Sequence, residues 1–324
     1  MPRWGLCFGP AWGSSIADLL KPAQAAEAAG FSRLTTGEYH SDPLSWAALL
    51  LAATHEVPIA TTIASIAPRH PTVVAEALAA LRDVHGDRLE LGLGVSHPSL
   101  VTEELNLPQP GLDDLEHYVR AVRSVLAGSP GEFGRYRVPR HQRDRRAPGA
   151  PPILVATLGA RAVQRATTFA DGMILTWTPD TWTRSLLHVA REGDADATAH
   201  RMACWAVLPT FVSDDLLAAR RGCAVALLPY LGMPSYQRML ATALDDPEKV
   251  AAAASATDAD ELLEVLGGRT LARIAAIGSP HRVASAIEML YDLGVDEVIL
   301  YPLDTGHGWK QAVEACITRC APTG

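Results

Sequence analysis

Several short clusters of polar residues in this sequence stand directly after apolar runs. One of them is Glu38, Tyr39 and His40 in the segment TTGEYH. Histidine can transfer a proton near neutral pH, and a neighbouring carboxylate fixes its tautomer and raises its basicity. Glu38 and His40 are two residues apart, so an extended chain would point both side chains the same way. The spacing therefore indicates proton transfer, although isolated polar triplets are also common on surfaces.

A second cluster ends the segment RLELGLGVSH, residues 88–97, in which alternating leucines lead to Gly92 and Gly94 and then to Ser96 and His97. Glycine weakens the interior of a strand and often marks a place where a ligand or another backbone approaches closely. The pattern predicts a strand whose end leaves room for a ligand beside bare main chain.

Two further clusters fit a flat anionic ligand. In ATLGAR, Thr157 and Gly159 precede a helix, and the free amides at a helix start can hold a phosphate. The alternative is a simple tight turn. Trp177 follows the apolar run MILT, and an indole there can form one wall of a pocket. Its alternative is packing in the core.

The histidines also permit a different class of site. His40, His70 and His97 follow three successive apolar runs, so a divalent-metal hydrolase or isomerase is conceivable. The paired histidine spacing and the carboxylates of such sites are missing, and a turn between two prolines would leave Arg69 and His70 in solvent. We predict no metal site, and reduced thiols at all five cysteines: Cys7, Cys204, Cys223, Cys316 and Cys320.

The clusters are positioned by an alternation of strand-like and helix-like segments. The last unit is the clearest, because Ser279 caps a helix, Pro280 starts it and Gly294 ends it. Eight such units predict a (β/α)8 barrel, with a doubly wound sheet as the alternative. The expected strands lie within residues 3–8, 32–38, 57–66, 88–94, 151–156, 171–177, 202–212 and 296–303.

Two inserts interrupt this alternation within what we expect to be a single domain, residues 1–324. Residues 128–150 carry six arginines, which indicates either a solvated loop or a rim that holds an anionic ligand tail through residues such as Arg143, Arg145 and Arg146. Residues 213–277 are rich in Ala and Leu and predict extra helices before the eighth strand, as a lid, substrate wall or subunit contact.

Bulk composition limits the class of protein. Hydrophobic residues make up 48% and the net charge is −8, which favours a globular chain without affinity for nucleic acid or anionic membranes. No apolar stretch resembles a secretion signal or a membrane span, so we expect a cytoplasmic protein. We also expect a small-molecule substrate and a homodimer.

Taken together, the segments resemble the bacterial luciferase-like superfamily of flavin and deazaflavin oxidoreductases. The resemblance rests on the stretch from AAEAAGF to GLGVSH, on PPILVATLGARAVQRATTFADGMILTW and on IGSPHRVASAIEMLYDLGVDEVIL. It covers nearly the whole chain outside the two inserts. The ending GLGVSH looks most like the actinobacterial branch that uses coenzyme F420, a 5-deazaflavin.

The resemblance implies roles for several of these residues. A bulge with a non-proline cis peptide would press main chain against the cofactor ring, and the matching positions are Ala64, Ser65 and Ile66. Gly94, Val95, Ser96 and His97 would approach the ring. The cofactor phosphate would lie in a cradle formed by Thr157, Leu158, Gly159, Ala160 and Arg161.

The resemblance also implies hydride transfer between C5 of the deazaflavin and an alkene, imine or carbonyl. His40 matches the family histidine near the reactive carbon, with His97 or Tyr39 as other proton donors. Some relatives have an acidic residue or a second histidine at position 39, or a glutamate at position 97, so the substrate does not carry over. An FMN-dependent monooxygenase and a non-catalytic ligand-binding homologue are the alternatives within the superfamily.

Overall fold

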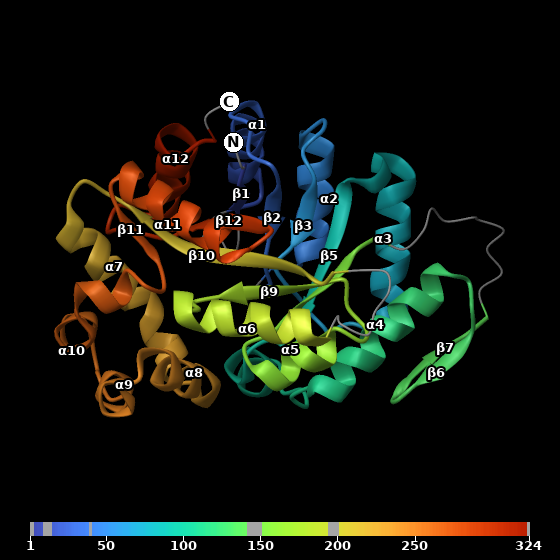
Figure 1. Ribbon diagram of the computed structural model, residues 1–324. Coiled ribbons are helices and arrows are strands. Elements are labelled where there is room, and N and C mark those ends of the chain that lie inside the picture. The colour runs from blue at the N-terminus through green and yellow to red at the C-terminus, as the bar shows by residue number, and fades with distance from the viewer. Residues whose placement is uncertain (1–2, 9–14, 39–40, 141–150, 194–200, 323–324) are drawn as a thin grey trace.

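Eight parallel strands close into a ring, which confirms the predicted (β/α)8 barrel. The order around the ring is β1, β2, β3, β5, β8, β9, β10 and β12, and β12 pairs again with β1. The computed structural model describes residues 3–8, 15–38, 41–140, 151–193 and 201–322 (Figure 1). The ring strands are β1 (Gly5–Cys7), β2 (Leu34–Thr36), β3 (Ile59–Thr61), β5 (Leu89–Gly94), β8 (Ile153–Ala156), β9 (Gly172–Thr176), β10 (Ala203–Val212) and β12 (Glu297–Pro302).

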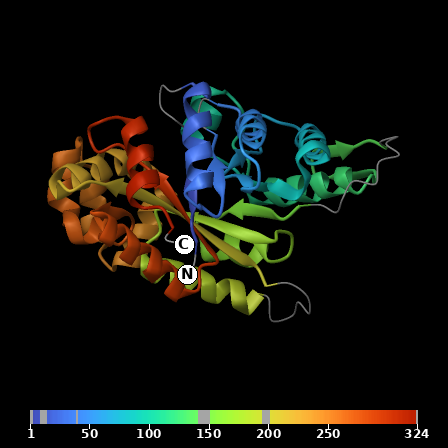
Figure 2. The same cartoon turned by 90° about the horizontal axis from the view of Figure 1, so that it is seen from above.

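Helices surround this ring (Figure 2). The last one before β12 shows why the sequence predicts them well, since Gly294 adopts a left-handed φ of 96° and Val283, Ile287 and Leu290 are buried. The helices of the repeat are α1 (Ala17–Ala28), α2 (Pro43–Ala53), α3 (Pro71–His85), α4 (Leu112–Leu126), α5 (Ala160–Ala166), α6 (Asp180–Gly193), α11 (Pro280–Leu293) and α12 (Trp309–Arg319), with short turns η1 (Gly86–Arg88) and η2 (Ser99–Glu104).

The two inserts lie on opposite sides of the barrel (Figures 1 and 2). The predicted extra helices are α7 (Leu216–Leu231), α8 (Pro234–Leu244), α9 (Pro247–Ala254) and α10 (Ala259–Leu271), followed by a short strand β11 (Ala276–Gly278) that pairs with β10. The basic insert begins with a hairpin of β6 (Gly131–Phe133) and β7 (Tyr136–Val138), and residues 141–150, with Arg143, Arg145 and Arg146, lie outside the described residues.

The core has three parts. Small and branched side chains such as Ala60, Leu154 and Val207 fill the barrel interior. The largest part lies between the strands and the surrounding helices, and a separate part lies within the helical insert. All five cysteines are buried and free, as predicted. In the part of the chain described here, no single helix is long and apolar enough to cross a membrane, and only α7 and α8 together, bent by 119°, reach that length and composition.

A charged layer closes the barrel at the amino ends of the strands. The guanidinium of Arg33 lies 2.6 Å from a carboxylate oxygen of Glu90 and 2.7 Å from one of Glu297, and it stacks 4.1 Å from the ring centre of Trp205. Burial raises the pKa of Glu297, and Arg33 opposes that shift. A carboxylate that is largely removed from water lowers the stability of the fold unless a cation lies beside it. Arg33 supplies that cation for both glutamates.

Replacing Arg33 by Ala should therefore lower the free energy of unfolding by about 3 kcal/mol, since two largely buried carboxylates, 17% and 14% exposed, lose their shared cation. Urea denaturation measures the change. The matched control is Arg221→Ala, which breaks an ion pair whose side chains are each 62% exposed and should cost no more than about 1 kcal/mol. Equal losses in both variants would contradict this interpretation of the layer.

Candidate functional site

The predicted site residues are collected at the carboxyl ends of the ring strands, here called the rim. Glu38 follows β2, Ser65 lies in β4 (Ala64–Ser65) directly after β3, and His97 follows β5. Thr157 follows β8 and Trp177 follows β9. Parallel strands in a closed barrel all present these ends on one face, which is where barrel enzymes carry their sites.

Glu38 is bound to the segment after β3. One carboxylate oxygen accepts a hydrogen bond from the Ser65 amide at 2.6 Å and pairs with the Arg69 guanidinium at 2.7 Å. The Glu38 amide also donates to the carbonyl of Ile63 at 3.1 Å. Glu38 thus braces the β3–β4 segment, while Tyr39 and His40 lie outside the described residues, so an orienting contact from Glu38 to His40 stays a prediction.

Arg69 is a member of this network that sequence reasoning placed in solvent, and that placement is wrong. Its side chain is 17% exposed and bridges Glu38 and Asp42, each at 2.7 Å. Burial raises the pKa of Glu38, and the hydrogen bond and charge of Arg69 oppose that rise. The pairing joins segments about thirty residues apart, which no local pattern in the sequence signals.

The cis peptide expected after β3 is present, but it lies two residues earlier in the chain than expected. The cis peptide joins Thr62 and Ile63 and precedes the predicted positions Ala64, Ser65 and Ile66. Ala64 and Ile66 are fully buried in the core between barrel and helices, and β4 pairs with the end of β5. The main chain of this segment is therefore fixed by Glu38 on one side and by β5 on the other.

The interpretation of Gly92 as space for a ligand is wrong. A Cβ at this position would lie 2.1 Å from the Thr61 carbonyl and 2.6 Å from a methyl carbon of Ile174, so the neighbouring strands already require glycine. At Gly94 a Cβ would meet the side chain of Ile63 at 3.0 Å. Gly92 therefore serves the packing of the barrel interior, whereas Gly94 lies at the rim, where the nearest atoms belong to the side chains of Ile63 and Ala156.

His97 is enclosed by aromatic rings of the helical insert. Its imidazole lies edge-on to Tyr230 of α7, with ring centres 5.4 Å apart, and 6.2 Å from Tyr236 of α8. Burial lowers the pKa of His97, which favours the neutral imidazole. Before it, Ser96 adopts a left-handed φ of 61°, and the carbonyls of Val95 and Ser96 accept from Gln109. Sequence reasoning missed both tyrosines because the insert carries no motif.

The segment from Thr157 to Arg161 forms the entry to α5. Gly159 is the residue before the helix, and a Cβ on it would meet no atom within 4 Å, so there is open space beside it. The Thr157 side chain is buried, and its hydroxyl has no hydrogen-bond partner among the described residues. The Leu158 side chain packs against the core of the helical insert, and its carbonyl accepts a hydrogen bond from the indole of Trp182 at 2.9 Å. Ala160 and Arg161 are exposed.

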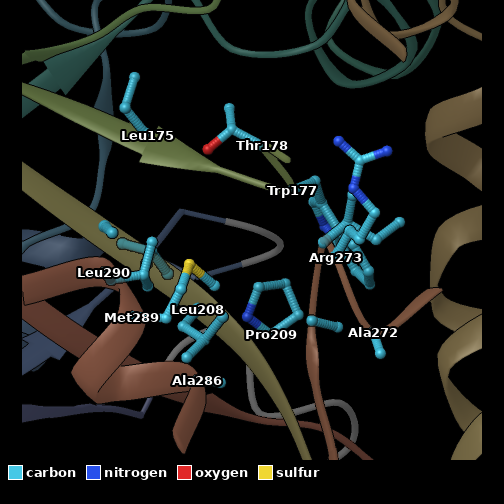
Figure 3. A pocket seen from close by; sticks show the side chains of 14 residues that line it. Leu175, Trp177, Thr178, Leu208, Pro209, Ala272, Arg273, Ala286, Met289 and Leu290 are labelled. Atoms are coloured by element: carbon cyan, nitrogen blue, oxygen red, sulfur yellow. The ribbon is translucent and has the colours of Figure 1, made fainter. Parts of the chain in front are cut away.

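Trp177 is buried and does not present an open face at the rim. It is 1% exposed, adopts a left-handed φ of 56° and packs against Tyr230 with ring centres 5.4 Å apart. Figure 3 shows it beside Arg273 at a small cavity between β10 and α11. That cavity holds about 20 Å³, room for roughly one water molecule, so it is no cofactor pocket.

The described histidines do not converge on a metal. His70 is exposed, accepts from the Thr72 amide at the start of α3 and contacts Tyr136, whereas His97 contacts the insert. Among the described residues no group of three or more His, Cys, Asp or Glu side chains has the arrangement of a metal site. The interpretation as a metal-dependent enzyme has no geometric support here.

A family comparison identifies this architecture. The family model described as luciferase-like monooxygenase matches residues 8–297. The chain belongs to this family. The luciferase-like resemblance predicted from the sequence is thereby confirmed.

Two curated luciferase-like relatives share part of the chain. Both are named F420-dependent glucose-6-phosphate dehydrogenase. The protein from Beutenbergia cavernae is 32% identical over 199 residues, or 55% of this chain, and the one from Nakamurella multipartita is 30% identical over 208 residues, or 57%. The match spans 58% of the length of each relative.

Solved structures of the luciferase-like fold include both cofactor types. The coenzyme F420-dependent tetrahydromethanopterin reductase of Methanopyrus kandleri superposes with a TM-score of 0.82, 17% identity and coverage of 98% of this chain and 97% of its own. The FMN complex of a type II Baeyer–Villiger monooxygenase from Pseudomonas putida superposes with a TM-score of 0.71 and 18% identity. The superposition covers 100% of this chain and 99% of the monooxygenase chain. At these identities the structures show the shared fold alone.

The burial of His97 predicts a pH dependence of stability. Its folded-state pKa lies below the ordinary value of about 6.5, so the unfolded chain binds the proton more readily, and stability is lost as the pH falls below that value. His97→Asn should lose less stability than the parent between pH 7.5 and 5.5 in urea unfolding. His188→Asn, at an exposed histidine, is the control and should follow the parent. An unchanged decline in His97→Asn would refute the assignment.

Proposed function

We propose that this protein is a coenzyme F420-dependent oxidoreductase that transfers a hydride between the deazaflavin C5 and a small organic substrate. The observation that carries the proposal is the match of more than half of the chain to two relatives whose names both specify F420. The F420-dependent structural neighbours superpose with TM-scores of 0.82 and 0.74, against 0.71 for the FMN complex, and an FMN-dependent monooxygenase is the alternative.

Features of the rim fit a flat cofactor with an anionic tail. The Thr157 hydroxyl is buried and has no hydrogen-bond partner in the described parts of the chain, and the open space at Gly159 lies two residues away, beside the first amides of α5. We propose that Thr157, Gly159 and Arg161 hold the cofactor phosphate, with Leu158 and Ala160 supplying main chain. The ring would lie against the main chain of Ser65 and Gly94, beside Val95 and Ser96. The buried Ala64 and Ile66 would support this segment from the core, and Trp177 would pack behind it.

The protein must supply positioning and a proton. When bound, the deazaflavin supplies two electrons as a hydride, and the protein fixes the geometry in which that transfer occurs. His40 is our first assignment for the proton, and His97 and Tyr39 are the others. Neutral His97 has one nitrogen that donates and one that accepts, so it can bind a carbonyl oxygen or pass on a proton. Glu38 holds the backbone of the β3–β4 segment in place through the Ser65 amide.

A homodimer in the cytoplasm remains part of the proposal. Helix α2 is apolar around most of its circumference and packs beside α3, and Leu49 on α2 and Val73 on α3 are 42% and 58% exposed. A contiguous exposed apolar patch can mark a subunit contact, and we propose the dimer interface at these two helices. The net charge of −8 gives no general attraction to nucleic acid, which is consistent with a small molecule as the main partner.

A spectral titration separates the two cofactors. Purified protein should bind F420 saturably and reduce or oxidise it with a suitable substrate, while FMN should bind at least about ten times more weakly, a difference of about 1.4 kcal/mol. Difference spectra recorded with each cofactor in both redox states measure this. Preferential binding of FMN, together with oxygen consumption by its reduced form, would replace the proposal by the monooxygenase alternative.

Thr157→Val tests the phosphate assignment separately. The substitution removes only the unpartnered hydroxyl, so it should leave stability nearly unchanged and weaken F420 binding by about ten-fold or more, as for a lost hydrogen bond to a charged group. Thr54→Val is the matched control, because the buried Thr54 hydroxyl donates to the Leu50 carbonyl at 2.7 Å. It should lose stability and keep its F420 affinity, and the reverse pattern would contradict the assignment.

A further inference from the structure

Tyr230 of the helical insert lies across the opening of the barrel. Its ring contacts His97 after β5 and Trp177 after β9, with both ring centres at 5.4 Å, and it is close enough to Tyr301 in β12 to contribute to the raised pKa of that phenol. The strands β5, β9 and β12 are not neighbours in the ring. A side chain that contacts the residues after two of these strands and lies near the third must therefore stand over the rim.

Tyr236 of α8 extends this aromatic surface. Its ring lies 5.0 Å from Tyr230 and 6.2 Å from His97, and the side chain is buried. We call Tyr230, Tyr236 and His97 the aromatic wall. Aromatic faces and edges bind other flat rings by stacking and edge contacts, and His97 adds a neutral imidazole with one hydrogen-bond donor and one acceptor. The wall is thus suited to a flat group with few polar atoms.

Several basic side chains of the insert are paired with other parts of the chain or exposed. Arg221 pairs with Asp260 at 2.8 Å, Arg273 pairs with Asp180 at 3.1 Å, and Arg220 lies against Gly268 of α10. Arg238 and Arg269 are exposed. A phosphorylated sugar is normally recognised by charge-assisted hydrogen bonds from Arg or Lys, and the aromatic wall itself supplies no cation.

We infer that this protein binds a flat, uncharged, ring-containing substrate against Tyr230 and His97 of the aromatic wall, which the buried Tyr236 supports from behind, in preference to the phosphorylated sugar named for its curated relatives. The inference rests on the proposed function for its chemistry, since the substrate must reach the same rim as the cofactor. Its binding step does not depend on which cofactor the protein uses.

Isothermal titration calorimetry tests this with two probes, benzylideneacetone as a flat uncharged enone and glucose 6-phosphate as the charged sugar. Each is titrated into the protein alone and into the protein saturated with F420. The enone should bind saturably and at least about ten times more tightly than the sugar phosphate. Tyr230→Ala should weaken enone binding about ten-fold, as for the loss of an aromatic contact and its buried area, and Tyr230→Phe should keep it.

Three results would overturn the inference: no saturable enone binding, equal or tighter binding of glucose 6-phosphate, or enone affinity that Tyr230→Ala leaves unchanged. Thermal unfolding of Tyr230→Phe and Tyr230→Ala verifies that both variants fold. Failure of F420 binding in the spectral titration, with Tyr230-dependent enone binding intact, would reject the proposed cofactor and keep the substrate class. If the protein binds F420 but turns over only the sugar phosphate, the proposed cofactor is kept and the substrate class is rejected.

Discussion

Closure of the eight-stranded ring is the constraint on which the rest of this structure depends. Each ring strand contributes only three to ten residues, yet pairing of β12 with β1 and of β9 with β10 brings all carboxyl ends to one face. Glu38 and Trp177 are far apart in sequence and share that face because the strands are parallel, and closure of the ring places them around one opening. The opposite end is sealed by Arg33 and its two glutamates, so the open rim is the end available for a ligand.

Order at the rim comes from polar contacts between loops as well as from the strands. The Glu38 carboxylate is largely removed from water, where it accepts a hydrogen bond from the Ser65 amide and pairs with Arg69. Burial alone would raise the pKa of Glu38 and favour its protonated form. A carboxylate that is buried, paired and bound to an amide fixes backbone more firmly than a mobile side chain can. The segment after β3 is therefore held in one conformation where the proposed cofactor ring would lie, which reduces the ordering that binding requires.

The sequence predicts the barrel well because its signals are local. Apolar periodicity, the proline start and the glycine stop around 280–294 each act over a few residues, and the structure confirms them. The errors arise where distant segments meet. Gly92 is required by Thr61 and Ile174 of two other strands, and Arg69 finds its carboxylate on the loop after β2. The position of the cis bond at Thr62–Ile63 is not indicated by the residue types in that segment.

The helical insert is the part of the site that sequence reasoning could least describe. Tyr230 and Tyr236 occur in an Ala- and Leu-rich stretch, and their contacts with His97 depend on how α7 and α8 pack over the ring. Trp177 shows the same limit, since its strand-end position suggested a pocket wall but its burial joins it to the insert core. Family membership sets the barrel and the rim, whereas the packing of the insert decides what the rim accepts.

A crystal structure of the protein grown with F420 tests most directly whether the cofactor binds at the rim. The deazaflavin ring should lie at the rim, between the main chain of Ser65 and Gly94 and the imidazole of His97, with the cofactor phosphate at Thr157 and the amides around Gly159. A deazaflavin bound elsewhere on the surface, or a rim that the side chains of this protein still fill at saturating cofactor, would contradict this placement.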